Sequence, residues 1–527
     1  MEHIVHHPHS RWQKFTYRQE KRHRPEDDLR LCNPGQTSSQ VVPRQRQILR
    51  DFLREVIPAA SRRIYPYLQD VERYSSDDSI ALLDDRQNHE GCEKISGKPC
   101  NDCVIFSRSV CIPELCARLQ EKRRTFKAEK RIIFIPNLTS AAAVCLAATV
   151  AERSAVTLRD FLHRYLKREV VFSATTTWGF FFEFHIPYHA MRRGPLTVTE
   201  DPRLIGDKRL RKTEPLPLGH HPSDQEDLYY HEALTSSLSW GADEWFWTEL
   251  CLVDTYFGSE EKHKSYFTGC QEGDGLDPPC GGRIHMTAPR FDPREYFLLK
   301  LKFRTEQVVT EYSTLIETFN KRMDEYAQTI RRVFEDDNKR TNTRTISDVI
   351  ETTQVFIDSL GVIVDAWETF HRTELSLFTS YIPERSLWPN YINSIMRNVA
   401  ELDRLRKTLL TKRDRFKFKL DSLHTVSSLS QTETGNLQAK TAVTQGDDLK
   451  MLTKMTVYVA FPLLFTTAFF SMDFVTPTYP WAAFFGVLVL MSLVNYMIAS
   501  PRRSQRVWKE CKTWCSAVLG NWTYNRI

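Results

Sequence analysis

The chain has 527 residues, and its 72 Lys and Arg against 66 Asp and Glu give a formal net charge of +6. This balance is too even to indicate a nucleic-acid-binding protein. The sequence contains no Gly-rich phosphate loop, no GxSxG and no HExxH, so we expect neither an enzyme nor an ATP-driven pump.

Residues 1–45 are polar, rich in His and Arg and without apolar periodicity, so we predict that they are disordered. They lack the apolar core of a signal peptide, and Glu2 and Glu20 make them a poor transit peptide. We therefore expect the long N-terminal part of the chain to remain in the reducing cytosol, where disulfides are rare.

Residues 46–125 form a cysteine-rich region that we expect to be partly ordered, with helical periodicity over Arg46–Tyr67 and Ile112–Phe126. A CxxC pair with further cysteines nearby can supply the thiolates of a structural zinc site. The candidate ligands are Cys92, Cys100, Cys103, Cys111 and Cys116. The spacing of the later cysteines does not match a standard zinc finger, so unligated thiols in a loop-rich segment are the alternative.

Residues 126–293 alternate between strand and helix patterns, which predicts an α/β or α+β domain with long loops. Arg131–Leu138 has the apolar run of a buried strand. Thr139 or Ser140 can cap the helix that follows.

Two more strands and a long connection are expected in the same region. The strands are Val170–Thr177 and Gly179–Ile186, the second closed by Pro187. Asp201–Asp227 carries several prolines and many charges, which predicts a long surface loop.

Residues 294–453 change to the pattern of long helices, which we expect to form a stalk. Heptad spacing of the coiled-coil type links Tyr312, Ile316, Phe319, Met323, Tyr326, Ile330 and Val333. Ser347 can cap a second helix, and a third repeats the heptad spacing from Ile392 to Leu423. Past His424 the sequence is polar and contains Gly435 and Gly446, which argues against one unbroken helix there.

Two long apolar runs lie within residues 454–500. Met455–Met472 is 18 residues without a charge, and Trp481–Ala499 is 19 more. At ~1.5 Å rise per residue each helix is about 27 Å long, close to the ~30 Å hydrocarbon core of a bilayer. Only Asp473–Pro480 separates them, so we predict a two-helix transmembrane hairpin. Two buried core helices of a soluble protein are the alternative.

The charges that flank this hairpin predict its orientation. Lys450 and Lys454 precede the first span, Arg502 and Arg503 follow the second, and the connecting loop has no Lys or Arg. The positive-inside rule therefore places both termini in the cytoplasm, including a basic tail at 501–527. We expect an integral membrane protein of the plasma membrane rather than of an organelle.

A short motif in the first span carries a family resemblance. Phe461-Pro462-Leu463 is followed ten residues later by Ser471-Met472-Asp473-Phe474. This pattern resembles the apolar-Pro-Leu and Gly-Met-Asn-Phe elements of the CorA magnesium-transporter superfamily. The segments RRIIFIPNL and GFFFEFHIPYHAMRR are similar to the N-terminal domains of divergent fungal members.

The resemblance implies a homopentamer in which the first span lines a pore and the second surrounds it. It implies that Ser471, Met472 and Asp473 form an outer mouth for hydrated magnesium, with Ser and Asp in place of the family's Gly and Asn. The pore-facing positions that it implies are Thr453, Phe461, Leu464 and Ala468. Lipid-facing or interhelical packing is the alternative role for these four residues.

Two functions stay open at this point. The first is a CorA-like channel for magnesium or another divalent metal cation, in which crowded Asp473 carboxylates attract the ion. The second is a non-conducting, membrane-anchored relative that serves interaction or regulation. For this chain we expect contact with membrane lipid and self-association. We expect no cofactor apart from the candidate structural zinc considered above.

Overall fold

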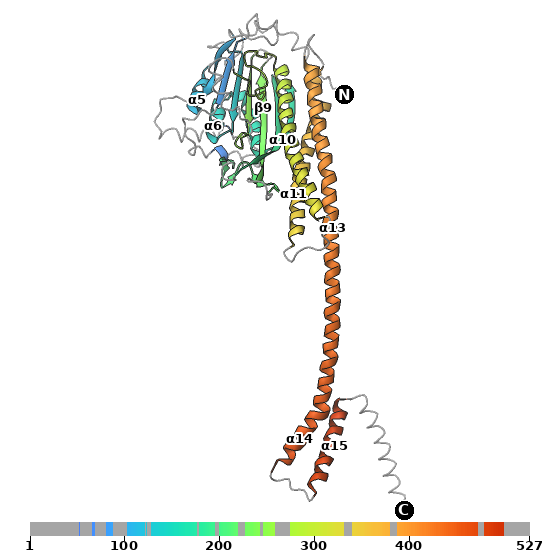
Figure 1. Ribbon diagram of the computed structural model, residues 1–527. Coiled ribbons are helices and arrows are strands. Elements are labelled where there is room, and N and C mark those ends of the chain that lie inside the picture. Colours follow the sequence, from blue (N-terminus) through green and yellow to red (C-terminus); the bar gives the residue numbers. More distant parts are fainter. Residues whose placement is uncertain are drawn as a thin grey trace, which may run out of the picture. The chain divides into compact units, whose positions relative to one another are not determined.

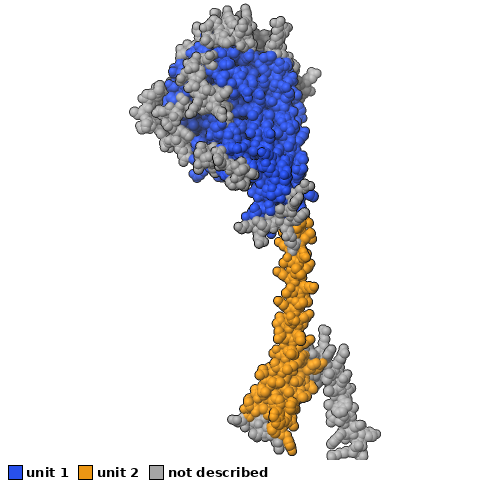
Figure 2. All heavy atoms as spheres, in the orientation of Figure 1, with its two compact units in different colours: residues 1–423 blue, residues 424–527 orange. Residues whose placement is uncertain are grey.

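In the computed structural model the described residues are 52, 66–68, 81–87, 103–121, 123, 128–176, 179–194, 200–219, 227–242, 246–258, 275–330, 340–379, 387–472 and 479–499. They fall into two compact units, residues 1–423 and 424–527, which Figure 2 colours separately and which we describe one at a time. The predicted disordered segment 1–45, the basic tail 501–527 and the mouth residue Asp473 lie outside the described residues.

Unit 1 is built on an eight-stranded sheet in the order β2-β1-β3-β10-β9-β5-β4, with β8 beside β9. β3 and β10 are parallel, and the other pairs are antiparallel. The strands are β1 (Ala81–Arg86), β2 (Val104–Val110), β3 (Lys130–Pro136), β4 (Val171–Thr176), β5 (Phe180–Arg193), β8 (Thr213–Pro215), β9 (Leu228–Gly241) and β10 (Trp247–Val253). The sheet therefore crosses the predicted boundary at residue 126, because β1 and β2 come before it.

β5 and β9 form the longest pair, from Phe180 opposite Gly241 to Arg193 opposite Leu228. Side chains of a strand alternate between the two faces of a sheet. This alternation places one set of β5 side chains in a single buried core: Phe180, Phe182, Phe184 and Ile186. The apolar side chains at every second position thus hold this long strand against the core.

The prediction that Pro187 closes this strand is wrong, because β5 continues to Arg193. Pro187 lies opposite Leu234 of β9, whereas β4 pairs with β5 only as far as His185. Beyond His185 no described strand covers that side of β5. A proline is tolerated at such an open edge, where its missing N–H is not needed by a neighbouring strand.

Long helices cover the face of the sheet that carries the β5 phenylalanines. They are α10 (Pro293–Thr329), α11 (Thr341–Thr373), the short α12 (Ser376–Thr379) and the first part of α13 (Trp388–Met455), and Figure 1 shows α10 beside β9. Phe297 of α10 packs against Phe182 and Phe184, with ring centroids 5.6 and 5.8 Å away. Each such buried side chain contributes about 2–3 kcal/mol of transfer free energy, which attaches the helices to the sheet.

Three shorter helices cover the opposite face: α5 (Ile112–Gln120), α6 (Ser140–Thr149) and α7 (Glu152–Lys167). Of the two predicted caps, Thr139 is the one used, since its hydroxyl accepts the Ala142 N–H at 3.2 Å. α5 ends before the predicted Phe126, because Glu121 adopts an extended backbone. Helices on both faces of the sheet confirm a mixed α/β domain with long helices.

Two helix predictions in the stalk region are wrong. α11 begins at Thr341, so Ser347 lies inside the helix and does not cap it. α13 is unbroken to Met455, although it contains Gly435 and Gly446. Both glycines lie in open space, and each costs only about 1 kcal/mol relative to Ala, which is too little to end a long helix.

In unit 2, α13 continues through a π-helical turn (Thr456–Ala460, hereafter the π turn) into α14 (Phe461–Phe470). α15 (Pro480–Ala499) packs against the π turn and α14. The helical stretch Trp388–Phe470 is long and apolar enough to cross a membrane, and the apolar part found in α15 is shorter. The described residues thus hold one candidate span by length and composition, and the second span of the hairpin stays a prediction.

Candidate functional site

The first apolar helix has one side that packs against α15. Pro462 and Thr466 are the buried side chains of α14, and the Thr466 hydroxyl donates to the Pro462 carbonyl at 2.7 Å. Further along, the rings of Phe470 and Phe484 lie 5.7 Å apart. These contacts fix which side of α14 faces its neighbour.

The four predicted pore residues are all exposed in the single chain: Thr453, Phe461, Leu464 and Ala468. Phe461 is 53% exposed and Leu464 is 66% exposed, which is far more than an apolar side chain in a folded core. At ~100° per residue, Phe461, Leu464 and Ala468 lie on the side of α14 opposite the two buried residues. They belong to the larger part of α14 that α15 leaves open, together with Leu463, Phe465 and Thr467, and their role as pore lining stays a prediction.

The predicted mouth begins where α14 ends. The Ser471 N–H donates to the carbonyls of Thr467 and Ala468 at 3.1 and 3.3 Å, and its hydroxyl donates to the Ala468 carbonyl at 2.7 Å. The Ser471 backbone is right-handed helical, with φ −80° and ψ −8°, so this position does not require glycine. Met472 follows, half-exposed, and Asp473 is outside the described residues.

A second polar feature of this helix, the π turn and its partner on α15, is not predicted from the sequence. The Phe461 N–H donates to the Thr456 carbonyl, five residues back. The Asn495 side-chain amide of α15 donates to the Val457 carbonyl at 3.1 Å, and Asn495 is only 9% exposed. A signal was present in the sequence, since Asn495 is a lone amide in an apolar run, and polar groups there commonly have a function.

The cysteine cluster is only partly described. Cys92 and Cys100 lie outside the described residues. Cys103 is buried directly before β2, and Cys111 directly precedes α5. A hydrogen bond to Cys145 of α6 lowers the pKa of Cys116, against the opposite effect of burial. Within the described residues no group of three His, Cys, Asp or Glu side chains could hold a metal, so the zinc site stays a prediction.

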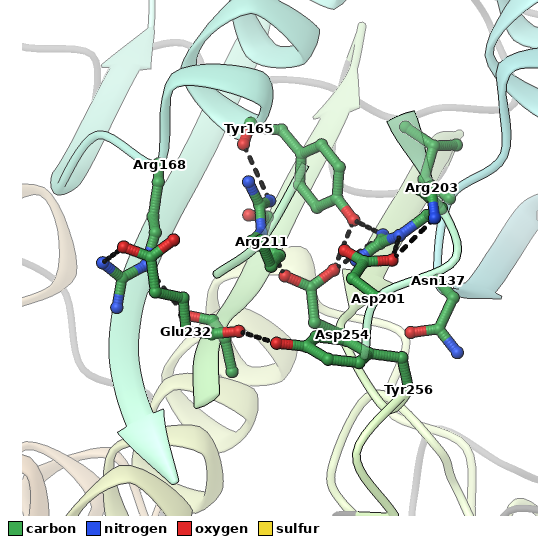
Figure 3. A network of polar contacts seen from close by, with 12 residues as sticks. Asn137, Tyr165, Arg168, Asp201, Arg203, Arg211, Glu232, Asp254 and Tyr256 are labelled. Carbon is green, nitrogen blue, oxygen red and sulfur yellow. Dashed lines mark hydrogen bonds and ion pairs between the residues drawn. The ribbon is translucent and has the colours of Figure 1, made fainter. Parts of the chain in front are cut away.

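A buried polar network includes Asp201, Arg203 and Arg211 of the segment Asp201–Asp227 (Figure 3), so the predicted surface loop is wrong for these residues, whereas residues 206–209 are exposed. Arg211 donates through Nε to Asp254 Oδ2 at 2.7 Å, and Arg203 Nη1 lies 2.9 Å from Asp254 Oδ1. The Tyr165 hydroxyl donates to the same Oδ1 at 2.6 Å. Arg203 also pairs with Asp201 at 2.8 Å.

The charges of this network explain why it can be buried. Burial acts to raise the pKa of the Asp254 carboxyl, but Arg203 and Arg211 outweigh it and lower that pKa to about 2. Burial raises the pKa of the Tyr165 hydroxyl well above its usual range. Asp254, Arg203 and Arg211 are each at most 1% exposed, so the network anchors the 201–211 segment against β10 and α7 rather than binding a ligand.

A second buried ion pair joins α10 to the sheet. The Lys300 ammonium contacts the Glu249 carboxylate of β10 and donates to the Ser237 and Ser239 hydroxyls at 2.7 and 3.1 Å. Both serines also donate to Glu249. The pair is completely buried and each charge has several polar partners, so we assign it a structural role.

Comparison with known proteins gives little that bears on these features. No family model matches the chain, and none of the curated proteins matches it. Among solved structures it is similar to the ZntB cytoplasmic domain from Vibrio parahaemolyticus RIMD 2210633, at 10% sequence identity and a TM-score of 0.30. That match covers 65% of this chain and 99% of the other. A similarity at this level establishes neither a family nor a function.

Proposed function

We propose that the chain is a CorA-like channel for divalent metal cations of the magnesium type. The observation that carries the proposal is the open face of α14, where Phe461, Leu464 and Ala468 are exposed while the opposite side packs on α15. An apolar face of this kind is covered by lipid, by a partner helix or by other copies of the chain. A ring of copies around one axis would turn it into a pore wall.

The side chains on this face suit a gated pore. Rings of Phe461 and Leu464 would form an apolar constriction, and such constrictions can close a channel by dewetting. Ala468 is small and lies nearer the predicted mouth, so the pore would widen towards Ser471 and Met472. This gives a wide entrance above a narrow apolar gate.

The mouth sequence suits a hydrated divalent cation. Magnesium gives up its water shell reluctantly, so a site that hydrogen-bonds to the bound waters avoids the cost of removing them. The Ser471 hydroxyl and the Asp473 carboxylate can both accept such hydrogen bonds. Carboxylates from several copies would repel one another without an ion, so a divalent cation would be held more firmly than by the family's neutral asparagine.

The remaining parts of the proposal concern the assembly and the membrane. We place the two apolar helices across a bilayer as a hairpin, with both termini in the cytoplasm and the channel in the plasma membrane. We further propose a homopentamer, in which the first span of each copy faces the axis. Membrane potential and the ion gradient would drive transport, since the chain has no nucleotide-binding motif.

A non-conducting, membrane-anchored protein for interaction or regulation is the second candidate. The observation that favours it is the replacement of both flanking residues of the mouth motif, Ser471 for Gly and Asp473 for Asn. In that case the exposed face of α14 would pack against lipid or a partner helix, and no ion would cross.

Magnesium uptake into liposomes that contain the full chain separates the two candidates. We expect uptake well above that of protein-free liposomes, and we expect Asp473→Ala to reduce it at least several-fold. Glu433→Ala is the matched control, because it removes the same charge from an exposed position on α13. Uptake no faster than in protein-free liposomes, or equal uptake by wild type and Asp473→Ala, would overturn the channel proposal.

A further inference from the structure

The π turn in the first apolar helix leaves one backbone carbonyl without its usual donor. An α-helix bonds each N–H to the carbonyl four residues back, but Phe461 N–H reaches Thr456, five residues back. In this pattern the N–H of residue 462 would bond to the Val457 carbonyl. Residue 462 is a proline, which has no N–H. The Val457 carbonyl therefore needs a partner from outside the helix.

Asn495 supplies that partner. Its side-chain N–H donates to the Val457 carbonyl at 3.1 Å, and the neighbouring rings of Tyr458 and Tyr496 lie 6.1 Å apart. An unsatisfied carbonyl in the hydrocarbon region of a bilayer costs several kcal/mol. In the alternative α-helical register, Phe461 would bond to Val457 and the unserved carbonyl would be that of Tyr458. Asn495 therefore favours the π register over the α register.

The choice of register decides which residue shares the open face of α14. A π turn accommodates one extra residue. The eight residues from Thr453 to Phe461 therefore rotate about the helix axis by about as much as seven residues of a regular α-helix. Seven steps are close to two full turns of ~3.6 residues, which places Thr453 above Phe461. In an unbroken α-helix the residue seven steps before Phe461 is Lys454, and Thr453 would be turned away by roughly 80°.

We propose that Asn495 is a positioning residue for ion conduction, because it holds the π turn that places the neutral Thr453, and not the cationic Lys454, in line with Phe461, Leu464 and Ala468. The inference rests on the proposed function for its consequence in transport, but the helix register can be measured independently of transport. A positive ring of Lys454 in the pore would repel divalent cations. Register and conduction are thereby linked through a single amide.

Magnesium uptake tests the consequence for transport. Asn495→Leu removes the donor, and we expect at least a tenfold loss of uptake in liposomes. Pro462→Ala adds an N–H that bonds to Tyr458 in the α register and leaves no carbonyl unserved there. The π register still skips one carbonyl where bonding returns from five to four residues back, so we expect this variant to favour the α register and lose uptake similarly, with no further loss in the double variant. Lys454→Thr should restore much of the uptake of Asn495→Leu and change wild type little. Additive losses, or no restoration by Lys454→Thr, would contradict the proposal.

Disulfide cross-linking reads the register without transport. One cysteine pair replaces Tyr458 and Tyr496 beside the π turn, and a control pair replaces Phe470 and Phe484 further along the same two helices. In membranes, we expect Asn495→Leu to reduce cross-linking of the first pair several-fold and to leave the second unchanged.

The outcomes are distinguishable. Unchanged cross-linking of the first pair in Asn495→Leu overturns the positioning role, whatever the uptake. Loss of both pairs also overturns it, because it would give Asn495 a general packing role. If cross-linking changes as expected but the wild type takes up no magnesium, the register assignment holds and the channel function fails.

Discussion

Replacing Asp254 by Asn tests whether the buried network in unit 1 carries the stability that its geometry implies. The substitution keeps the shape of the side chain and removes its charge. Arg203 would keep Asp201 as an anionic partner at 2.8 Å, but Arg211 would lose its anionic partner and keep only neutral ones, such as the Tyr165 carbonyl at 3.0 Å. Arg211 is 1% exposed, so its charge would be left almost uncompensated inside the protein.

The expected loss follows from breaking one buried ion pair. Removing one partner of such a pair typically costs about 3–5 kcal/mol, because the remaining charge stays buried. Replacing both charges by apolar groups is much less costly. Asp254→Asn with Arg211→Met should therefore be more stable than Asp254→Asn alone.

Native-state hydrogen exchange of the full chain measures this loss at β9 and β10, which flank the network. The matched control is Asp324→Asn, which breaks an exposed pair with Lys412. Asp324 is 49% exposed, so we expect its loss to cost less than about 1 kcal/mol. If Asp254→Asn costs no more than this control, or if Arg211→Met makes Asp254→Asn less stable, the buried network does not stabilise unit 1 as its geometry implies.

Three further outcomes are expected. The Asp254 pKa is lowered from near 4 to about 2, so it contributes ~2 kcal/mol of stability above pH ~4 that is lost as pH falls towards 2. Hydrogen exchange measured at several pH values should show this loss of stability in the wild type and not in Asp254→Asn. Phe182→Ala removes a fully buried ring that lies 5.6 Å from Phe297 and 5.2 Å from Phe378, and should cost about 3–5 kcal/mol in chemical denaturation. Thr139→Ala removes the cap of α6 and should cost ~1 kcal/mol, seen as faster exchange in its first turn.

Local patterns in the sequence were enough to predict the features that depend on near neighbours. The apolar run from Arg131 predicts β3, and Thr139 is a cap because its hydroxyl serves an amide three residues on. The apolar runs after Met455 predict α14 and α15. In each case the residues that decide the structure are close together in the chain.

Features decided by distant residues could not be predicted in this way. Pro187 stays within a strand because β4 ends beside His185, which only the pairing of the sheet reveals. Arg203 and Arg211 are buried because Asp254, more than 40 residues away, lies between them.

The candidate site shows the same division between local and distant residues. Pro462 alone indicates an irregular helix. The choice of the π register depends on Asn495, which lies on the other apolar helix.

The function proposed for this chain is conduction of divalent cations through its first apolar helix. The most direct test is the rate of magnesium entry into liposomes holding the full chain, with an inside-negative potential applied by a potassium gradient and valinomycin. We expect entry that increases with the potential and falls sharply in Asp473→Ala. Entry that equals protein-free liposomes at every potential would contradict it.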